Sequence, residues 1–132
     1  MGKRVRLVIP GKLPGLNEYI LAERTSRYRA AEIKRDTEYL IGLAARQQLR
    51  GARFRKPVVM HYTWMEPNRK RDKDNIAFAK KFIQDALVRT GVLENDGWDQ
   101  IAGFEDEFKV DARNPRVEVV ITEMERDEEA GH

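Results

Sequence analysis

The residue types that suit chemistry are concentrated in one charged stretch of the chain. It reads Arg69-Lys70-Arg71-Asp72-Lys73-Asp74-Asn75. Asp72 and Asp74 are two positions apart, and in an extended segment this spacing points both carboxylates to the same side. Magnesium binds one or two carboxylates together with water and phosphate oxygens, and basic side chains beside them suit phosphate. The stretch therefore predicts a divalent metal site that binds a phosphate-bearing substrate.

A helix is predicted directly after this stretch, over residues 74–89, because apolar residues recur there at steps of three and four. At about 100° per residue, Asp74, Lys81 and Asp85 fall within roughly 40° of one another. They lie opposite the apolar face that is predicted to enter the core. Gly91 stands where a C-terminal cap is expected. The pattern thus predicts a polar stripe with a lysine between two carboxylates.

A third acid, Asp96, follows the glycine and is predicted to fold back toward the start of the helix. Three carboxylates from two segments hold a magnesium ion while leaving positions for water and substrate. Lys81 would then hold the scissile phosphate or stabilise charge that develops on it. As structural alternatives, Asp72 or Asp74 caps the helix and Asp96 belongs to a simple turn. Lys81 and Asp85 would likewise form only an ion pair one turn apart.

Composition predicts one domain over residues 1–123, followed by an acidic, frayed tail over residues 124–132. Apolar residues make up 41% of the chain and charged residues 36%, which is typical of a globular protein with a charged surface. Residues 1–56 hold 14 Lys and Arg against 5 Asp and Glu, whereas residues 57–132 hold 11 against 17. A basic half and an acidic half suit a phosphate-binding surface beside a carboxylate site.

Missing residue types exclude several chemistries. The chain has no cysteine, so no disulfide, thiol nucleophile or cysteine-based zinc site is expected, and a cytoplasmic location is predicted. Ser26 is the only serine, and the histidines are His61 and His132, which argues against a serine–histidine–aspartate triad. His61 lies in a strand pattern and is assigned no role. No apolar run approaches the ~20 residues of a membrane helix, so no membrane partner is expected.

Hydrophobic patterns predict strands at residues 5–9, 57–65, 101–110 and 117–121, and helices at residues 26–49 and 74–89. Asn17 is predicted to cap a short turn between the first strand and the first helix. The order β, α, β, α, β, β predicts a small mixed β-sheet with two main helices packed on it, an α/β or α+β domain.

The outer face of the helix predicted over residues 26–49 is rich in arginine, and Arg24 and Arg27 lie at its start. Three interpretations are open: a solvated face, a surface for a nucleic-acid backbone, and a dimer contact. Tyrosines lie among these arginines, and they suit stacking on unpaired bases as well as burial in the core.

These motifs resemble the RusA family of Holliday junction resolvases, including the RusA-like proteins of phages and prophages. The family signature is a basic run, Asp-x-Asp-Asn, a helix with Lys-x-x-x-Asp-Ala-Leu, a glycine and an acidic pair. In this chain the parts are Arg69 to Asn75, Lys81 to Leu87, Gly91 and Asn95-Asp96. The loop Pro14-Gly15-Leu16-Asn17-Glu18-Tyr19 also resembles the family's Pro-x-x-Asn-x-Tyr loop. The likeness covers nearly the whole chain.

The resemblance implies a RusA-like fold and a homodimer that uses magnesium or manganese and no small-molecule cofactor. The catalytic carboxylates and metal ligands fall on Asp72, Asp74 and Asp96. The essential lysine falls on Lys81, and Asp85 would support it. DNA contact is predicted for Arg69, Lys70, Arg71, Lys73, Asn75, Lys80, Asn17, Arg24 and Arg27.

Two departures from the family pattern matter. The segment from Asp74 to Lys81 is longer than in the type member, so Lys80 competes with Lys81 for the lysine role. Asn95 replaces the first acid of the usual pair. The resemblance implies paired phosphodiester hydrolysis across a four-way DNA junction, in DNA recombination and repair. The alternatives are a nuclease for other branched DNA such as flaps, and a non-catalytic module that binds nucleic acid.

Overall fold

Four strands form one mixed sheet in the computed structural model, which describes residues 3–124. They are β1 (Arg4–Pro10), β2 (Val58–Glu66), β3 (Ile101–Val110) and β4 (Arg116–Glu123), in the sheet order β1-β4-β2-β3. β4 pairs antiparallel with β1 and with β2, whereas β2 and β3 are parallel. The predicted mixed sheet is confirmed. The predicted tail lies outside the described residues, except for Met124.

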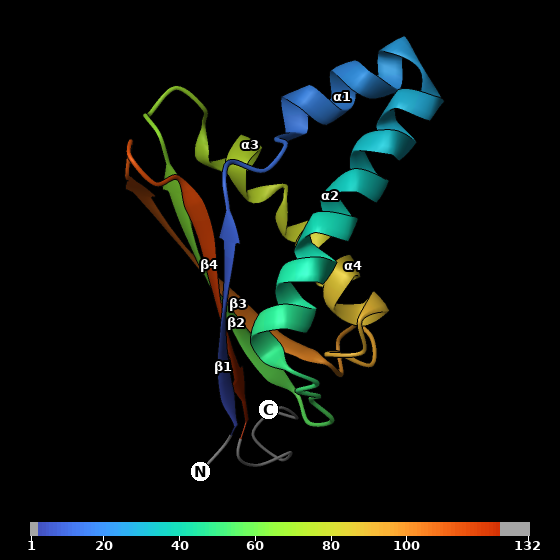
Figure 1. Ribbon diagram of the computed structural model, residues 1–132, viewed down its shortest axis with the longest axis vertical. Helices are drawn as coiled ribbons and strands as arrows, with labels where there is room; N and C mark the ends of the chain where they lie inside the picture. Colours follow the sequence, from blue (N-terminus) through green and yellow to red (C-terminus); the bar gives the residue numbers. More distant parts are fainter. Residues whose placement is uncertain (1–2, 125–132) are drawn as a thin grey trace.

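The helices pack against one face of this sheet (Figure 1). They are α1 (Leu16–Thr25), α2 (Arg27–Leu49), α3 (Lys73–Ala77) and α4 (Lys80–Arg89). The side chain of Ser26 caps α2 by accepting a hydrogen bond from the backbone N–H of Tyr28 at 3.1 Å. The prediction that Asn17 caps a short turn is wrong, because the cap residue of α1 is Gly15 and Asn17 lies inside the first turn. Between residues 3 and 124, no helix is both long and apolar enough to span a membrane.

The core lies between the sheet and α2 and α4. Leu7, Tyr62 and Ile121 point into it from three strands, and Ile41 and Ile83 meet them from the two helices. These side chains are almost fully buried, and burial of one such side chain stabilises the fold by about 1.5–3 kcal/mol. The alternation of apolar and charged residues along β1 therefore follows from one covered and one open face of the sheet.

The open face carries charged side chains. Arg6 on β1 pairs with Glu118 on β4 at 2.9 Å, and this contact lowers the pKa of the Glu118 carboxyl. His61 on β2 lies between two acids of β3, with Nδ1 3.2 Å from Glu105 and Nε2 3.5 Å from Glu107.

The predicted helix over residues 74–89 is broken into α3 and α4. Around the break, the N–H of Lys81 bonds to the carbonyl of Phe78 at 3.1 Å, and that of Phe82 bonds to Ala79 at 3.0 Å. Such three-residue steps tighten the turn. They let Phe78 and Phe82 pack edge-on, with ring centroids 5.6 Å apart, and both contact Tyr19 of α1. The continuous polar stripe that a single helix would make is therefore divided between two segments.

Candidate metal and DNA site

A cavity of about 650 Å³, called here the first cavity, opens where β2 ends and α3 begins. Because β2 and β3 are parallel, the carboxyl end of β3 reaches the same edge and closes one side of it. Its wall combines acidic, basic and apolar side chains. They are Glu66, Asn68, Arg69, Arg71, Asp72, Lys73, Asp74, Ile76, Phe108, Lys109 and Val110.

Asp72 and Asp74 are exposed at this wall. Asp72 is the N-cap residue of α3, but its side chain makes no capping hydrogen bond. Asp74 lies in the first turn, where the helix dipole favours a negative charge, and one of its oxygens accepts the N–H of Asn75 at 2.9 Å. The Asp72 carboxylate is therefore not used by the helix. Together the two acids offer oxygen ligands of the kind that magnesium prefers.

Arg71 directly precedes these acids in the chain, and its guanidinium is bonded to other groups of the protein. Its Nε and Nη2 donate to the two carboxylate oxygens of Glu66 at 2.9 and 2.8 Å, and its Nη1 donates to the carbonyl of Leu13 at 3.0 Å. The Arg71 side chain is only 15% exposed and the Glu66 side chain only 9%. A paired, forked contact of this kind fixes orientation. The geometry favours a role for Arg71 in positioning the loop that carries Asp72, rather than in contacting DNA.

Asn75 likewise holds the scaffold together. Its Oδ1 accepts the backbone N–H of Asn17 at 2.9 Å, which ties the start of α1 to α3. Gly15 lies directly beside this contact, and a Cβ there would stand 2.5 Å from Asn75 Oδ1 and 2.8 Å from Arg71 Nη1. The Pro-x-x-Asn-x-Tyr loop therefore packs on the charged stretch through its glycine. DNA contact by Asn17 and Asn75 stays a prediction.

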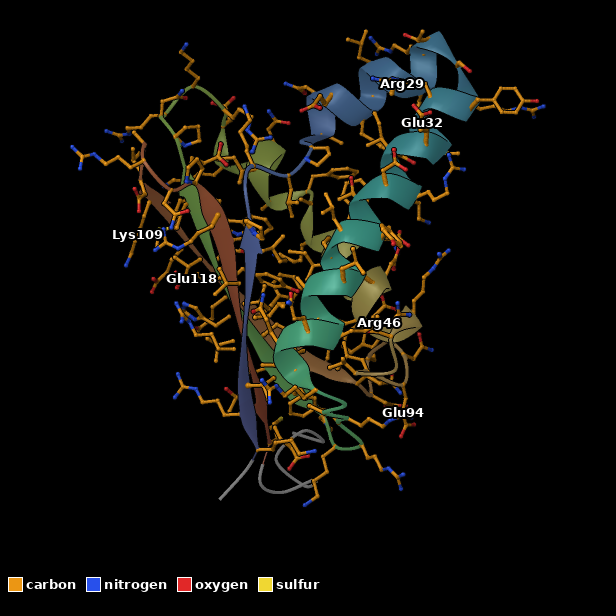
Figure 2. All side chains as sticks on the ribbon, in the orientation of Figure 1. Arg29, Glu32, Arg46, Glu94, Lys109 and Glu118 are labelled. Carbon is orange, nitrogen blue, oxygen red and sulfur yellow. The ribbon has the colours of Figure 1, made fainter. Side chains whose placement is uncertain are left out.

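Asp96 lies elsewhere, in a second hollow of about 260 Å³. This hollow is lined by Lys34, Glu38, Asp85, Val88, Arg89, Asn95 and Asp96. Figure 2 places Lys109, from the wall of the first cavity, and Glu94, at the start of the Asp96 loop, on opposite sides of the molecule. Among residues 3–124, no three acids come close enough to hold one ion. One subunit therefore brings Asp72 and Asp74 together but does not bring Asp96 to them.

The two lysines that compete for the catalytic role have different surroundings. Lys80 is 14% exposed, and its Nζ lies 2.7 Å from Asp106 and 3.6 Å from the centre of the Phe104 ring. Lys81 is 63% exposed, and its Nζ lies 3.3 Å from Asp85. The predicted Lys81–Asp85 pair is thus present. Because Lys80 is held inside the fold, the geometry favours Lys81 as the lysine that reaches a substrate.

Glu38 of α2 forms the buried floor of the second hollow. It is 4% exposed, and its Oε2 has no hydrogen-bond partner among the described residues. Burial raises the pKa of the Glu38 carboxyl, while Lys34 at 3.9 Å and Arg89 at 3.3 Å act in the opposite direction. A buried carboxylate without a full set of partners is costly, so this residue makes the fold sensitive to pH. Sequence reasoning placed no role on it.

The other residues predicted to contact DNA are exposed. Arg69 and Lys70 lie on the loop after β2, and Lys73 leans over the Phe108 ring with Nζ 5.6 Å from its centre. Arg24 and Arg27 lie at the junction of α1 and α2. These side chains are accessible to a phosphate backbone, and their role in binding stays a prediction.

Six cavity residues were missed by sequence reasoning: Glu66, Asn68, Ile76, Phe108, Lys109 and Val110. The last three come from the end of β3, and only the parallel pairing with β2 brings them to the charged stretch. Glu66 directly precedes the loop, so a pairing with Arg71 five residues later was the available signal. The cavity therefore has an apolar side that the charge pattern did not reveal.

The donor set fits a divalent cation in part. Across residues 3–124, no three Asp, Glu, His or Cys side chains come close enough to hold one ion. Two exposed carboxylates with basic neighbours are nevertheless enough for magnesium, which completes its shell with water and substrate oxygens. We call Asp72 and Asp74 the first half-site, and Lys81, Asp85 and Asp96 the second half-site.

The family model described as Endodeoxyribonuclease RusA matches residues 10–122, nearly the whole chain. The matched segment contains the first cavity, the second hollow and the loop that packs on Asn75. A search of the curated proteins finds no match.

Proposed function

Because the chain belongs to the RusA endodeoxyribonuclease family, we propose that it is a metal-dependent nuclease that resolves four-way DNA junctions in recombination and repair. The observation that carries this proposal is the first half-site. The carboxylates of Asp72 and Asp74 line a cavity together with basic side chains. The bases are Arg69, Lys73 and Lys109, and the Asp72 side chain makes no capping hydrogen bond to α3. Acids that hold a cation, placed beside bases that hold phosphate, are what phosphodiester hydrolysis requires.

Asp72 and Asp74 would hold magnesium or manganese. When bound, the ion supplies polarisation of the scissile phosphate and a lower pKa for coordinated water. Arg69 and Lys73 bind the flanking phosphates as exposed point charges. Arg71, through its contact with Glu66, holds the loop that carries Asp72 in place when the DNA strand binds. The chain's own part in the reaction is thus to position the phosphate and to concentrate charge around it.

A homodimer supplies the third acid in this proposal. Within one subunit Asp96 lies in the second hollow, so a second copy is needed to bring it to Asp72 and Asp74. We assign the composite site to the first half-site of one subunit and the second half-site of its partner, which also delivers Lys81. A two-fold dimer makes two such sites, and two sites suit paired cuts in opposite strands of a junction.

The test uses the full-length protein with end-labelled four-way junction, linear duplex and flap, in magnesium, manganese or chelator. We expect cutting of the junction in either metal and none in chelator. Asp74→Asn is expected to abolish cutting while binding of the junction stays equal or becomes tighter, because the change removes a ligand and a negative charge near phosphate. Tight binding without cutting in any metal would instead identify a non-catalytic module, and preferential cutting of the flap would identify a different branched substrate.

A further inference from the structure

Trp98 is the most exposed large apolar side chain among the described residues, at 99%. It lies on the loop between α4 and β3, two residues after Asp96. No side chain between residues 3 and 124 covers it. A tryptophan in this setting is the residue type that most often anchors an interface, because its large rigid ring loses little conformational freedom when it is buried.

The loop beneath Trp98 is held by its own hydrogen bonds. Asn95 Oδ1 accepts the N–H of Asp96 at 2.9 Å, and Gln100 Oε1 accepts the N–H of Gly97 at 3.1 Å. The N–H of Ile101 donates to the carbonyl of Gly97 at 3.0 Å. The indole is therefore presented on a closed turn, not on a slack segment, and little ordering is needed before it docks.

The first cavity offers a matching receptor. Its apolar side is formed by Ile76, Phe108 and Val110, and Val110 is 52% exposed although it is a large apolar residue. The volume of about 650 Å³ has room for an indole beside the carboxylates. Trp98 belongs to the loop that begins at Glu94, and Figure 2 places Glu94 on the opposite side of the molecule from Lys109, which lines the first cavity. The cavity of its own subunit is therefore out of its reach.

The charges of the two surfaces are complementary. The Trp98 loop carries the acids Glu94, Asp96 and Asp99. The first cavity carries four bases against three acids, a net charge of +1: Arg71 is paired with Glu66, and Arg69, Lys73 and Lys109 lie beside Asp72 and Asp74. An acidic loop with an apolar tip thus matches a net basic cavity with an apolar side, called here the apolar floor. Such matching selects a partner and its orientation. The same acids disfavour a phosphate backbone as the group that covers Trp98.

From this match we infer that Trp98 of each subunit seats on the apolar floor of the partner's first cavity and anchors the dimer. The inference rests on the proposed function, since it names the contact that joins the two half-sites. Asp96 and Trp98 are two residues apart, which is no more than about 7 Å along the chain. The apolar floor and the Asp72–Asp74 pair line one cavity. A seated Trp98 therefore carries Asp96 toward the acid pair.

Intrinsic fluorescence isolates this contact, because the chain has two tryptophans and Trp64 is 1% exposed. Sedimentation velocity first defines protein concentrations at which the full-length chain is monomeric and dimeric. Quenching by neutral acrylamide is then measured at both, and Trp98→Phe gives the Trp64 signal to be subtracted. We expect the Trp98 signal to be protected several-fold in the dimer and fully accessible in the monomer.

Variants on both surfaces complete the test. Trp98→Ala and Val110→Glu are each expected to weaken dimerisation at least tenfold, with unchanged far-UV circular dichroism. Leu21→Ala removes another exposed apolar side chain, 66% exposed on α1, and is expected to leave the dimer unchanged. It is the matched control for general loss of surface hydrophobicity.

Several results would overturn the inference: a dimer in which Trp98 stays fully quenchable, protection that arises only when junction DNA is added, or a chain that is monomeric at every concentration. The second result would identify a nucleobase as the occupant. A dimer with protected Trp98 that cuts no DNA would refute the proposed nuclease function and leave this contact standing. The two proposals therefore fail separately.

Discussion

Arg69 and Arg71 are the same residue type in the same basic run, yet their surroundings in the structure differ. Arg71 makes three hydrogen bonds inside the protein, two of them to Glu66, whereas Arg69 is exposed. Arg71→Met removes the partner of a carboxylate that is only 9% exposed. Removing one partner of a buried pair costs about 3–5 kcal/mol. Because both side chains keep some contact with water, we expect the lower end of this range, about 3 kcal/mol.

Thermal unfolding followed by circular dichroism measures this cost. For a domain of this size, about 3 kcal/mol corresponds to a fall in Tm of roughly 10 °C. Arg69→Met is the matched control and is expected to change stability by less than about 0.5 kcal/mol. The double variant Glu66→Gln with Arg71→Met is expected to lose less than the sum of the two single changes, since it leaves neither charge unpaired.

The salt dependence of junction binding separates the two arginines a second time. A lost phosphate contact lowers the slope of log K against log salt by about one unit. We expect this loss for Arg69→Met, and an unchanged slope for Arg71→Met at temperatures where it remains folded. The positioning role of Arg71 would be refuted if Arg71→Met had the wild-type Tm and its slope of log K against log salt fell by about one unit.

Three further predictions concern the scaffold, the buried acid and the lysine. Gly15→Ala places a Cβ 2.5 Å from Asn75 Oδ1 and is expected to destabilise the fold by about 1–3 kcal/mol, as measured by denaturant unfolding; wild-type stability would show that Asn75 moves aside freely. Burial raises the pKa of Glu38, so its protonation favours the folded state, and this contribution is lost as pH rises through the folded pKa. Glu38→Gln is therefore expected to melt higher than the wild type near pH 7 and no higher near pH 4; a constant gap in Tm would contradict this. Lys81→Ala is expected to lower the cutting rate without lowering Tm, whereas Lys80→Ala is expected to lower Tm because it breaks the ion pair with the half-buried Asp106; the reverse pattern would exchange their roles.

Local patterns were sufficient to predict most of the fold. Strand and helix periods located all four strands, α2 and the helical region after the charged stretch, because each depends on burial of one face. The break at Phe78 could not be predicted in this way. It depends on the packing of that ring against Tyr19 and Phe82, and therefore on where α1 lies.

The candidate site was predictable only where it is local. Asp72 and Asp74 lie on one cavity wall because their spacing is short, although only Asp72 is extended and Asp74 already lies in the first turn of α3. The position of Asp96 depends on the path of the loop after α4, which no local spacing determines. Arg71 differs from Arg69 because it pairs with Glu66. The apolar floor depends on the parallel pairing of β2 with β3. These long-range contacts are set by tertiary structure.

Mixing two inactive variants tests the composite site most directly. Asp74→Asn damages the first half-site and Asp96→Asn damages the second, so each variant alone is expected not to cut a four-way junction. If each site is built from both subunits, a mixed dimer contains one site with neither change. When equal amounts exchange subunits at random, about half of the dimers are mixed, and each mixed dimer has one complete site of two. The mixture then has roughly a quarter of the wild-type number of complete sites, and each mixed dimer nicks only one strand. A mixture that exchanges subunits, binds the junction and still makes no nick would contradict the shared site.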